Sequence, residues 1–135
     1  MVSNPTASTF VKGINCIYVP VSKVKESAEW YSRNFGLPLL NEVNEDSTQA
    51  QLKISGDQSI FLIKTREKMN LTYTEVTGHE QCILTLEVKD IKELYEHFKK
   101  NGAPVEEILD NAECGLSFYV KDPDGNKLDL WGGWA

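Results

Sequence analysis

The side chains that most often bind metals or act as nucleophiles are few in this 135-residue chain. The three cysteines are Cys16, Cys82 and Cys114; no two have the C-x-x-C spacing of a zinc finger, and an odd count does not suit a disulfide scaffold. Free thiols in a reducing cytosol are therefore expected. His79 falls in a predicted linker, and His97 is expected on the solvent face of a helix. A nucleophilic Cys16 would need a neighbouring base and none is evident, so an inert thiol is expected.

The acidic character of the chain lies entirely in its second half. Residues 1–78 carry 8 Lys/Arg and 8 Asp/Glu, whereas residues 79–135 carry 6 and 12. An acidic chain without a basic stripe repels phosphate, which argues against nucleic acid as a partner and suits a neutral or cationic small molecule. No apolar run is long enough for a membrane span, and the N-terminus has no secretory pattern. A cytoplasmic protein with no membrane partner is expected.

The chain repeats itself at half its length. The β-type runs 16–21 and 83–88 are each followed by a helical pattern with one apolar stripe, and the two halves are offset by 67 residues. Ser22 is predicted to cap the first helix, and Asp90 with Glu93 forms a capping-box pattern for the second. Glycines are placed to end both helices, at positions 36 and 102.

Strand patterns follow each predicted helix, so each half reads β-α-β-β-β. The organisation predicted is an arm, a first module, a linker and a second module, at residues 1–9, 10–65, 66–80 and 81–135. The strands predicted after the helices are 39–44, 48–54 and 59–65 in the first half, and 105–109, 114–121 and 127–132 in the second. The last two are joined by a turn at 122–125. The fold class is α+β: two βαβββ modules related by an internal repeat and paired around a shared cleft, because one helix covers only one face of a sheet.

Strand alternation divides the strand residues into two faces. One set is entirely aliphatic and is predicted to face the helices: Ile17, Val19, Val21, Leu84, Leu86, Val88, Leu128 and Leu130. The other set is predicted to line the cleft and mixes aromatic, aliphatic and acidic side chains: Cys16, Tyr18, Ser59, Phe61, Ile63, Ile83, Thr85, Glu87, Lys127, Asp129 and Trp131. Under an alternative interpretation, Phe61, Ile83 and Trp131 pack as a core between the sheets.

Residues 10–132 resemble the vicinal oxygen chelate superfamily, which includes glyoxalases, bleomycin-resistance proteins, fosfomycin-resistance transferases and extradiol dioxygenases. The resemblance rests on 14–21, 27–31 and 34–37, and on the closing hairpin 118–131. In catalytic members a divalent metal is held by four positions, usually filled with His, Glu or Gln. The resemblance places these positions at Cys16, Phe61, Ile83 and Asp129, and two of these four side chains cannot bind a metal.

The resemblance therefore implies a metal-free binding protein of the bleomycin-resistance type, which takes a small, cationic or aromatic molecule in the cleft. The ligand-contacting residues expected are Cys16, Tyr18, Phe61, Ile83, Thr85, Glu87, Asp129 and Trp131, with no cofactor. The alternative is a metal-dependent lyase, isomerase or dioxygenase that uses Asp129, with Cys16 and Gln81 as further ligands. A third hypothesis is an accessory protein that binds a protein partner. Relatives often form dimers, so a homodimer is also expected.

Overall fold

The computed structural model describes residues 10–135, so the predicted arm at 1–9 lies outside the described residues. The first module holds a three-stranded sheet, in which β1 pairs in parallel with β3 and β2 pairs antiparallel with β3. Its elements are β1 (Cys16–Val21), α1 (Val24–Phe35), β2 (Gln49–Ser55) and β3 (Gln58–Lys64).

The second module repeats this order around a four-stranded sheet, β6-β9-β8-β7, in which only the β6–β9 pair is parallel. Its elements are β6 (Thr85–Glu87), α2 (Ile91–Lys100), β7 (Leu109–Asp110), β8 (Leu116–Lys121) and β9 (Lys127–Trp131), with a 3-10 turn at Ala112–Cys114. The predicted linker at 66–80 is not featureless, because it contributes to a small hairpin of β4 (Thr72–Thr74) and β5 (Glu80–Cys82).

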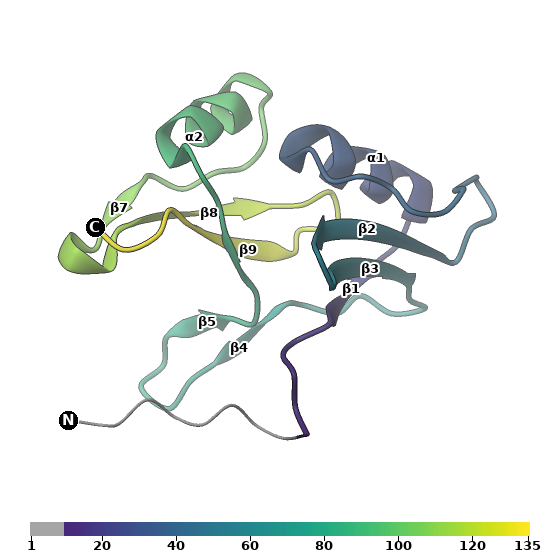
Figure 1. Cartoon of the computed structure of the whole chain (residues 1–135), viewed down its shortest axis with the longest axis horizontal. Coiled ribbons are helices and arrows are strands. Elements are labelled where there is room, and N and C mark those ends of the chain that lie inside the picture. Colours follow the sequence, from purple (N-terminus) through teal and green to yellow (C-terminus); the bar gives the residue numbers. More distant parts are fainter. Residues whose placement is uncertain (1–9) are drawn as a thin grey trace.

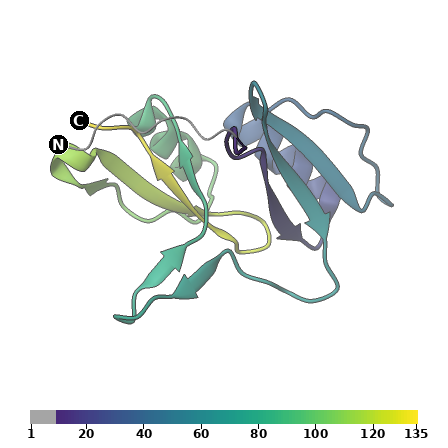
Figure 2. The same ribbon diagram turned by 60° about the horizontal axis from the view of Figure 1, so that its bottom comes forward.

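Both helices lie on the same side of the two sheets, and the β4–β5 hairpin lies on the other side (Figure 1). The modules stand side by side, with the hairpin segment connecting them (Figure 2). The two helices meet through aromatic rings, since the Phe98 ring centroid lies 5.7 Å from that of Trp30 and 5.4 Å from that of Phe35. This arrangement confirms an α+β fold of two βαβββ-like modules.

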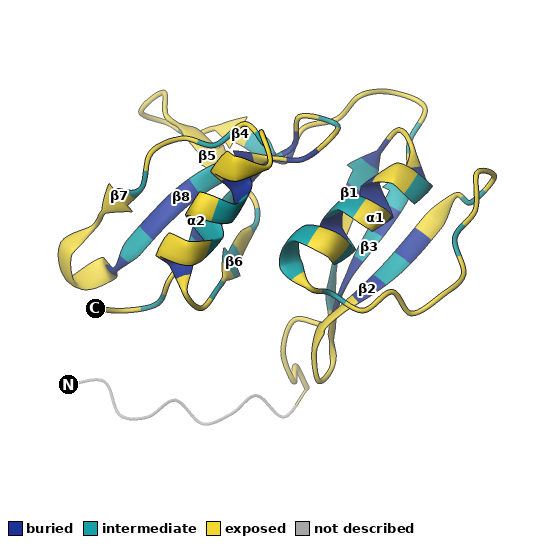
Figure 3. Ribbon diagram, turned by 90° about the horizontal axis from the view of Figure 1, so that it is seen from above, coloured by how far each residue is buried: buried dark blue, intermediate teal, exposed yellow. Residues whose placement is uncertain are grey.

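The core of each module lies between its sheet and its helix, as the buried residues beneath α1 and α2 in Figure 3 show. The predicted helix-facing set accounts for much of this core: Val19, Val21, Leu128 and Leu130 are buried, and Ile17, Leu84, Leu86 and Val88 pack against them partly buried. Complete burial of a Leu or Val side chain contributes about 1.5–3 kcal/mol. Among residues 10–135, neither helix is both long and apolar enough to span a membrane.

Several local predictions are wrong. The segment 39–44 forms only an isolated bridge between Leu39 and Leu52, and 105–109 forms a bridge at Val105 followed by the short β7. Ser22 does not cap α1, whose N-cap position is Lys23, and the capping box at α2 is absent because Asp90 adopts a left-handed conformation without a side-chain cap. The predicted helix end at glycine 36 is confirmed by its left-handed φ of 69°.

The turn between β8 and β9 fastens the second module to the first. Asp122 is buried, and its Oδ2 accepts a hydrogen bond from the Tyr31 phenol of α1 at 2.6 Å. Asp124 accepts hydrogen bonds from the Ser22 N–H at 3.0 Å and the Ser27 hydroxyl at 3.4 Å. The Asn126 amide donates to the Pro20 carbonyl at 2.9 Å. These bonds join residues about a hundred positions apart and hold the two sheets in a fixed relation.

Candidate functional site

The first wall of the candidate site is the helix-free face of the β1–β3 pair. The parallel register places Cys16 beside Ser59 and Tyr18 beside Phe61. The rings of Tyr18 and Phe61 lie 5.5 Å apart at 32°, and Tyr18 is 64% exposed. A side-chain hydrogen bond with Cys16, and the charge of that thiol when it ionises, raise the pKa of Tyr18 above its usual value. This wall therefore offers an accessible, neutral aromatic surface at pH 7.

A shallow cavity of about 290 Å³ adjoins this aromatic pair. Phe61 and Ser59 line it from β3 and Gln51 from β2, and the Gln51 amide donates to the Ser59 hydroxyl at 3.1 Å. All of its lining residues belong to the first module: Asn15, Leu40, Gln51, Lys53, Gly56, Asp57, Ser59 and Phe61. Strand alternation did not include Gln51 in the predicted lining, although its register opposite Phe61 on β3 places it on this face.

The second wall is the helix-free face of the β6–β9 pair. Thr85 lies beside Asp129, and its hydroxyl donates to the Asp129 Oδ2 at 2.8 Å. Glu87 lies beside Trp131 one pleat further on. The Trp131 indole N–H donates to the Cys114 carbonyl at 2.6 Å, which fixes the ring in place. The wall thus presents two carboxylates and a positioned indole, as strand alternation predicted.

The C-terminal segment covers part of this wall, because the rings of Trp131 and Trp134 meet edge to face at 4.9 Å. Trp134 itself is 76% exposed. A ligand on Trp131 would therefore also alter the surroundings of Trp134, which makes the pair a fluorescent reporter for this face.

A cationic residue at the edge of the second wall is already paired. Lys127 donates to Glu80 at 3.0 Å and pairs with Glu106 at 3.1 Å, and its ammonium lies 4.3 Å from the centroid of the Tyr119 ring. Desolvation acts to lower the pKa of Lys127, but the hydrogen bonds and charges of these two carboxylates together outweigh it and raise that pKa. Tyr119 stands opposite Asp129 in the β8–β9 ladder and belongs to the same face. Strand alternation along β8 would have assigned Tyr119 to this face from the sequence.

Cys82, at the end of β5, is not suited to nucleophilic chemistry. The side chain is buried, and burial, with the nearby charge of Asp129, raises its pKa to about 11. Only about one thiol in a thousand would be ionised at pH 8. We therefore interpret Cys82 as a buried packing residue rather than a nucleophile.

Gln81, which the alternative metal site would use as a ligand, and the nearby His79 lie in or next to the β4–β5 hairpin. His79 belongs to its turn, where its backbone N–H donates to the Glu75 carboxylate at 2.9 Å. The Gln81 amide donates to the Cys82 carbonyl at 3.2 Å. The other histidine, His97, is not fully solvated as predicted: it is partly buried, and its Nε2 lies 2.9 Å from the Asn34 Oδ1. That bond crosses between α2 and α1, away from the helix-free faces.

The donor set at the four predicted metal positions does not fit a divalent cation. Phe61 and Ile83 have no ligating atom, Cys16 offers a thiol, and Asp129 offers one carboxylate that already accepts from Thr85. Among residues 10–135, no group of three or more His, Cys, Asp or Glu side chains is arranged to hold a metal ion. The four positions therefore do not supply the ligands that a bound metal would need.

Within residues 10–135, the helix-free faces do not close on one another. Ile83 is 53% exposed, and Phe61 and Trp131 are only partly buried, so these three do not form a closed core between the sheets. The structure brings the predicted residues together in two groups: Cys16, Tyr18 and Phe61 on one wall, and Thr85, Glu87, Asp129 and Trp131 on the other. Pairing of the walls around one cleft stays a prediction.

A model of the glyoxalase/bleomycin resistance protein/dioxygenase superfamily matches residues 13–130. The chain is 30% identical over 122 residues to the metallothiol transferase FosB of Staphylococcus haemolyticus, covering 89% of this chain and 83% of that protein. Among solved structures, TnmS3, an antibiotic binding protein from Streptomyces sp. CB03234, aligns with a TM-score of 0.70 at 21% identity, over 93% of this chain and 99% of that one. The lactoylglutathione lyase of Agrobacterium tumefaciens aligns at 0.69 and 17% identity, over 93% and 96%.

Proposed function

Because the chain belongs to the glyoxalase/bleomycin resistance protein/dioxygenase superfamily, we propose that it binds a small cationic or aromatic molecule on the helix-free faces of its sheets, without a metal. The observation that carries this proposal is the donor set at Cys16, Phe61, Ile83 and Asp129, which lacks two ligands. The similarity in fold to an antibiotic binding protein is consistent with it.

The chemistry of the two walls supports the choice of ligand. The exposed Tyr18–Phe61 pair can stack against a planar molecule, with offset or tilted packing worth about 0.5–1.5 kcal/mol beyond area burial. Asp129 and Glu87 supply negative charge on the other wall, and aromatic faces also attract cations. A planar cation can use both kinds of contact, whereas a planar anion is repelled by the carboxylates.

The proposal includes a second copy of the chain as the partner that covers the open faces. Tyr18 on the first wall and Ile83 next to the second are both more than half exposed, and exposed apolar side chains on open faces mark surfaces that a partner covers. Light scattering after size-exclusion chromatography should give a mass near twice 15.2 kDa. A monomer at all concentrations up to the solubility limit would contradict this part.

Ligand binding is tested with proflavine, a planar cation, while tryptophan fluorescence is followed. Binding should quench Trp131, and Asp129→Asn should weaken the affinity about fivefold, the effect of losing roughly 1 kcal/mol from one charge contact. The matched control is Asp46→Asn, which removes an exposed carboxylate from the loop after α1 and should leave the affinity unchanged. The quenching should become smaller in Trp131→Phe, because only Trp134 then reports on this face.

Two results would count against the binding proposal. One is equal affinity for proflavine and for anthracene-9-carboxylate, a planar anion, because the acidic wall would then play no part. The other is quenching that persists unchanged in Asp129→Asn and Trp131→Phe, because the probe would then bind elsewhere.

A metal-dependent enzyme is the second candidate, and the 30% identity to a metallothiol transferase favours it. Its ligands would be Cys16, Gln81 and Asp129, which provide one sulfur and two oxygens. Elemental analysis of freshly purified protein separates the candidates. Stoichiometric nickel, zinc, iron or manganese that disappears in Asp129→Ala would replace the metal-free proposal with this one.

A further inference from the structure

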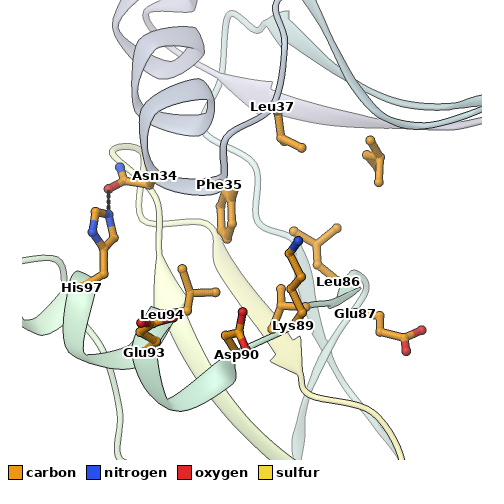
Figure 4. A pocket seen from close by; sticks show the side chains of 12 residues that line it. Asn34, Phe35, Leu37, Leu86, Glu87, Lys89, Asp90, Glu93, Leu94 and His97 are labelled. Atoms are coloured by element: carbon orange, nitrogen blue, oxygen red, sulfur yellow. Dashed lines mark hydrogen bonds between the residues drawn. The ribbon is translucent and has the colours of Figure 1, made fainter.

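A groove of about 560 Å³ lies between the two modules, on the side of the helices rather than on the helix-free faces. We call it the inter-helix groove, formed by the end of α1, the start of α2 and the tip of β2. Phe35 and Leu37 line it from the first module, and Leu94 lines it from the second (Figure 4). The volume lies within the range of about 300–1,000 Å³ that is usual for small-molecule sites.

The internal repeat explains why this groove is open. At the start of α1, the corresponding place is filled by the β8–β9 turn of the other module, through Asp122 and Asp124. The two hairpins align with an offset of 68 residues, since Leu52 pairs with Ile60 as Val120 pairs with Leu128. The groove is therefore the place where the β2–β3 turn would sit if it bound α2 as its twin binds α1.

The residues that fasten the β8–β9 turn have been replaced in its twin. Ile54 stands where Asp122 would be, and glycine 56 stands where Asp124 would be, so the β2–β3 turn has neither carboxylate. The helix residues that bind the turn differ in the same way. At an offset of 67, α2 has Phe98 where α1 has Tyr31, and Leu94 where α1 has Ser27. Hydrogen-bonding groups on both sides have become apolar, and Ile54 lines the groove 37% exposed.

The charge at the mouth of the groove is negative. Asp90 and Glu93 line it against a single ammonium, that of Lys89; Glu87 borders the groove, but its side chain belongs to the helix-free face of β6. In Figure 4 the Asp90 side chain points from the start of α2 toward Phe35. Asp90 also has a left-handed backbone, with a φ of 53°, a conformation that Asp and Asn adopt more readily than other residues with a side chain.

We propose that the inter-helix groove is a second binding site, separate from the helix-free faces, and that it takes a small organic ammonium with an apolar body. The apolar body contacts Phe35, Ile54 and Leu94. It occupies the place next to α2 that the β2–β3 turn would fill if that turn packed as the β8–β9 turn does. The ammonium faces Asp90 and Glu93. An anionic ligand is disfavoured by the excess of carboxylates. The site does not depend on the function proposed above, since it shares none of the sheet-face residues except Glu87.

The test is a titration of the ¹⁵N-labelled full chain with phenethylammonium, followed by amide chemical shifts. Shifts should concentrate at Phe35, Leu94 and His97, with a Kd on the order of 1 mM for so small a probe. The anionic isostere 3-phenylpropionate should bind at least fivefold more weakly. Amides of Tyr18, Phe61 and Asp129 report separately on the helix-free faces, so failure of one site is distinguishable from failure of the other.

Two variants test the groove itself. Ile54→Trp fills it from a partly exposed position and should abolish the shifts. Asp90→Asn keeps the shape and tolerates a left-handed backbone, and it should weaken phenethylammonium about fivefold. The matched control is Glu26→Gln, which changes the twin of Glu93 at the start of α1, outside the groove, and should have no effect.

The proposal is overturned by any of four results. The first is no shift at millimolar probe, and the second is equal binding of 3-phenylpropionate. The third is a shift pattern centred on Tyr18, Phe61 and Asp129. The fourth is groove amides that shift on dilution without any probe, because a second copy of the chain would then be the occupant.

Discussion

Replacing Tyr31 with phenylalanine should loosen the attachment between the two modules. The phenol donates a hydrogen bond of 2.6 Å to the carboxylate of Asp122, and both side chains are buried. The ring remains in the substitution, so its contacts with the rings of Trp30 and Phe35 are kept. The change therefore isolates one charge-assisted hydrogen bond that joins residues 91 positions apart.

The expected loss of stability depends on the hydrogen bonds that the Asp122 carboxylate retains in the variant. Asp122 still accepts from the backbone N–H of Asp124 at 2.9 Å, and from the N–H and amide of Asn126, both at 2.8 Å. A single hydrogen bond to a charged group contributes about 1.5–3 kcal/mol. Because three other donors remain, we expect the free energy of unfolding to fall by about 2 kcal/mol at pH 7.

The loss of stability in Tyr31→Phe should increase with pH. Burial raises the pKa of Asp122, while the Tyr31 hydrogen bond acts to lower it. A group whose folded pKa is raised contributes stability that is present at low pH and is lost as pH rises through that pKa. Without the phenol the pKa of Asp122 in the folded protein rises further, so the variant loses more stability than the wild type as the pH rises. The difference between the two proteins should widen from about 1 kcal/mol at pH 3 to about 2 kcal/mol at pH 7.

Urea unfolding followed by circular dichroism at both pH values measures this difference. With a slope of about 2 kcal/mol per molar urea, the midpoint at pH 7 should fall by about 1 M. Tyr73→Phe, which removes the phenol of an exposed tyrosine in β4, is the control and should change nothing. A cost below about 0.5 kcal/mol, or one that is equal at pH 3 and pH 7, would refute the reasoning.

Two further predictions concern the second module. Iodoacetamide at pH 8 should modify the exposed Cys114 long before the buried Cys82, whose pKa is raised to about 11; mass spectrometry of digests would show the order, and early modification of Cys82 would contradict the burial. Lys127→Met should lower the urea midpoint, because it breaks the ion pairs with Glu80 and Glu106, whereas Lys92→Met on the exposed face of α2 should not. Lys127 lowers the pKa of Glu80, so the deficit should be present above about pH 4.5 and shrink as the pH falls; a deficit that grows in acid would be inconsistent with this pairing.

The periodic parts of the fold could be predicted from the sequence because each depends on its own residues. Val24, Ala28 and Tyr31 mark the buried face of α1 by spacing alone, and all three are buried. The helix starts could not be predicted in this way. The N–H of Ser22 is taken by Asp124, which is 102 residues away, so the local capping pattern loses to a long-range partner.

In the candidate site, too, the features set by local periodicity could be predicted, whereas those set by long-range contacts could not. Strand alternation assigns Tyr18, Thr85 and Asp129 to the helix-free faces, because alternation depends only on the pleat. How the two faces sit relative to each other depends instead on the contact between α1 and α2 and on the β8–β9 turn, which carry no periodic signal. For the same reason His97, which looks solvent-facing on its own helix, is partly buried against Asn34 of the other helix.

The position of the β8–β9 turn in the chain also has a consequence for biosynthesis. The strands and helix of the first module are made early, but the Asp122 and Asp124 carboxylates that hold α1 are made about a hundred residues later. At about 5–20 residues per second, that interval is roughly 5–20 s. During it, Ser22, Ser27 and Tyr31 lack the carboxylates to which they donate in the folded protein. The nascent first module therefore lacks these contacts until a turn about a hundred residues further along the chain has been synthesised.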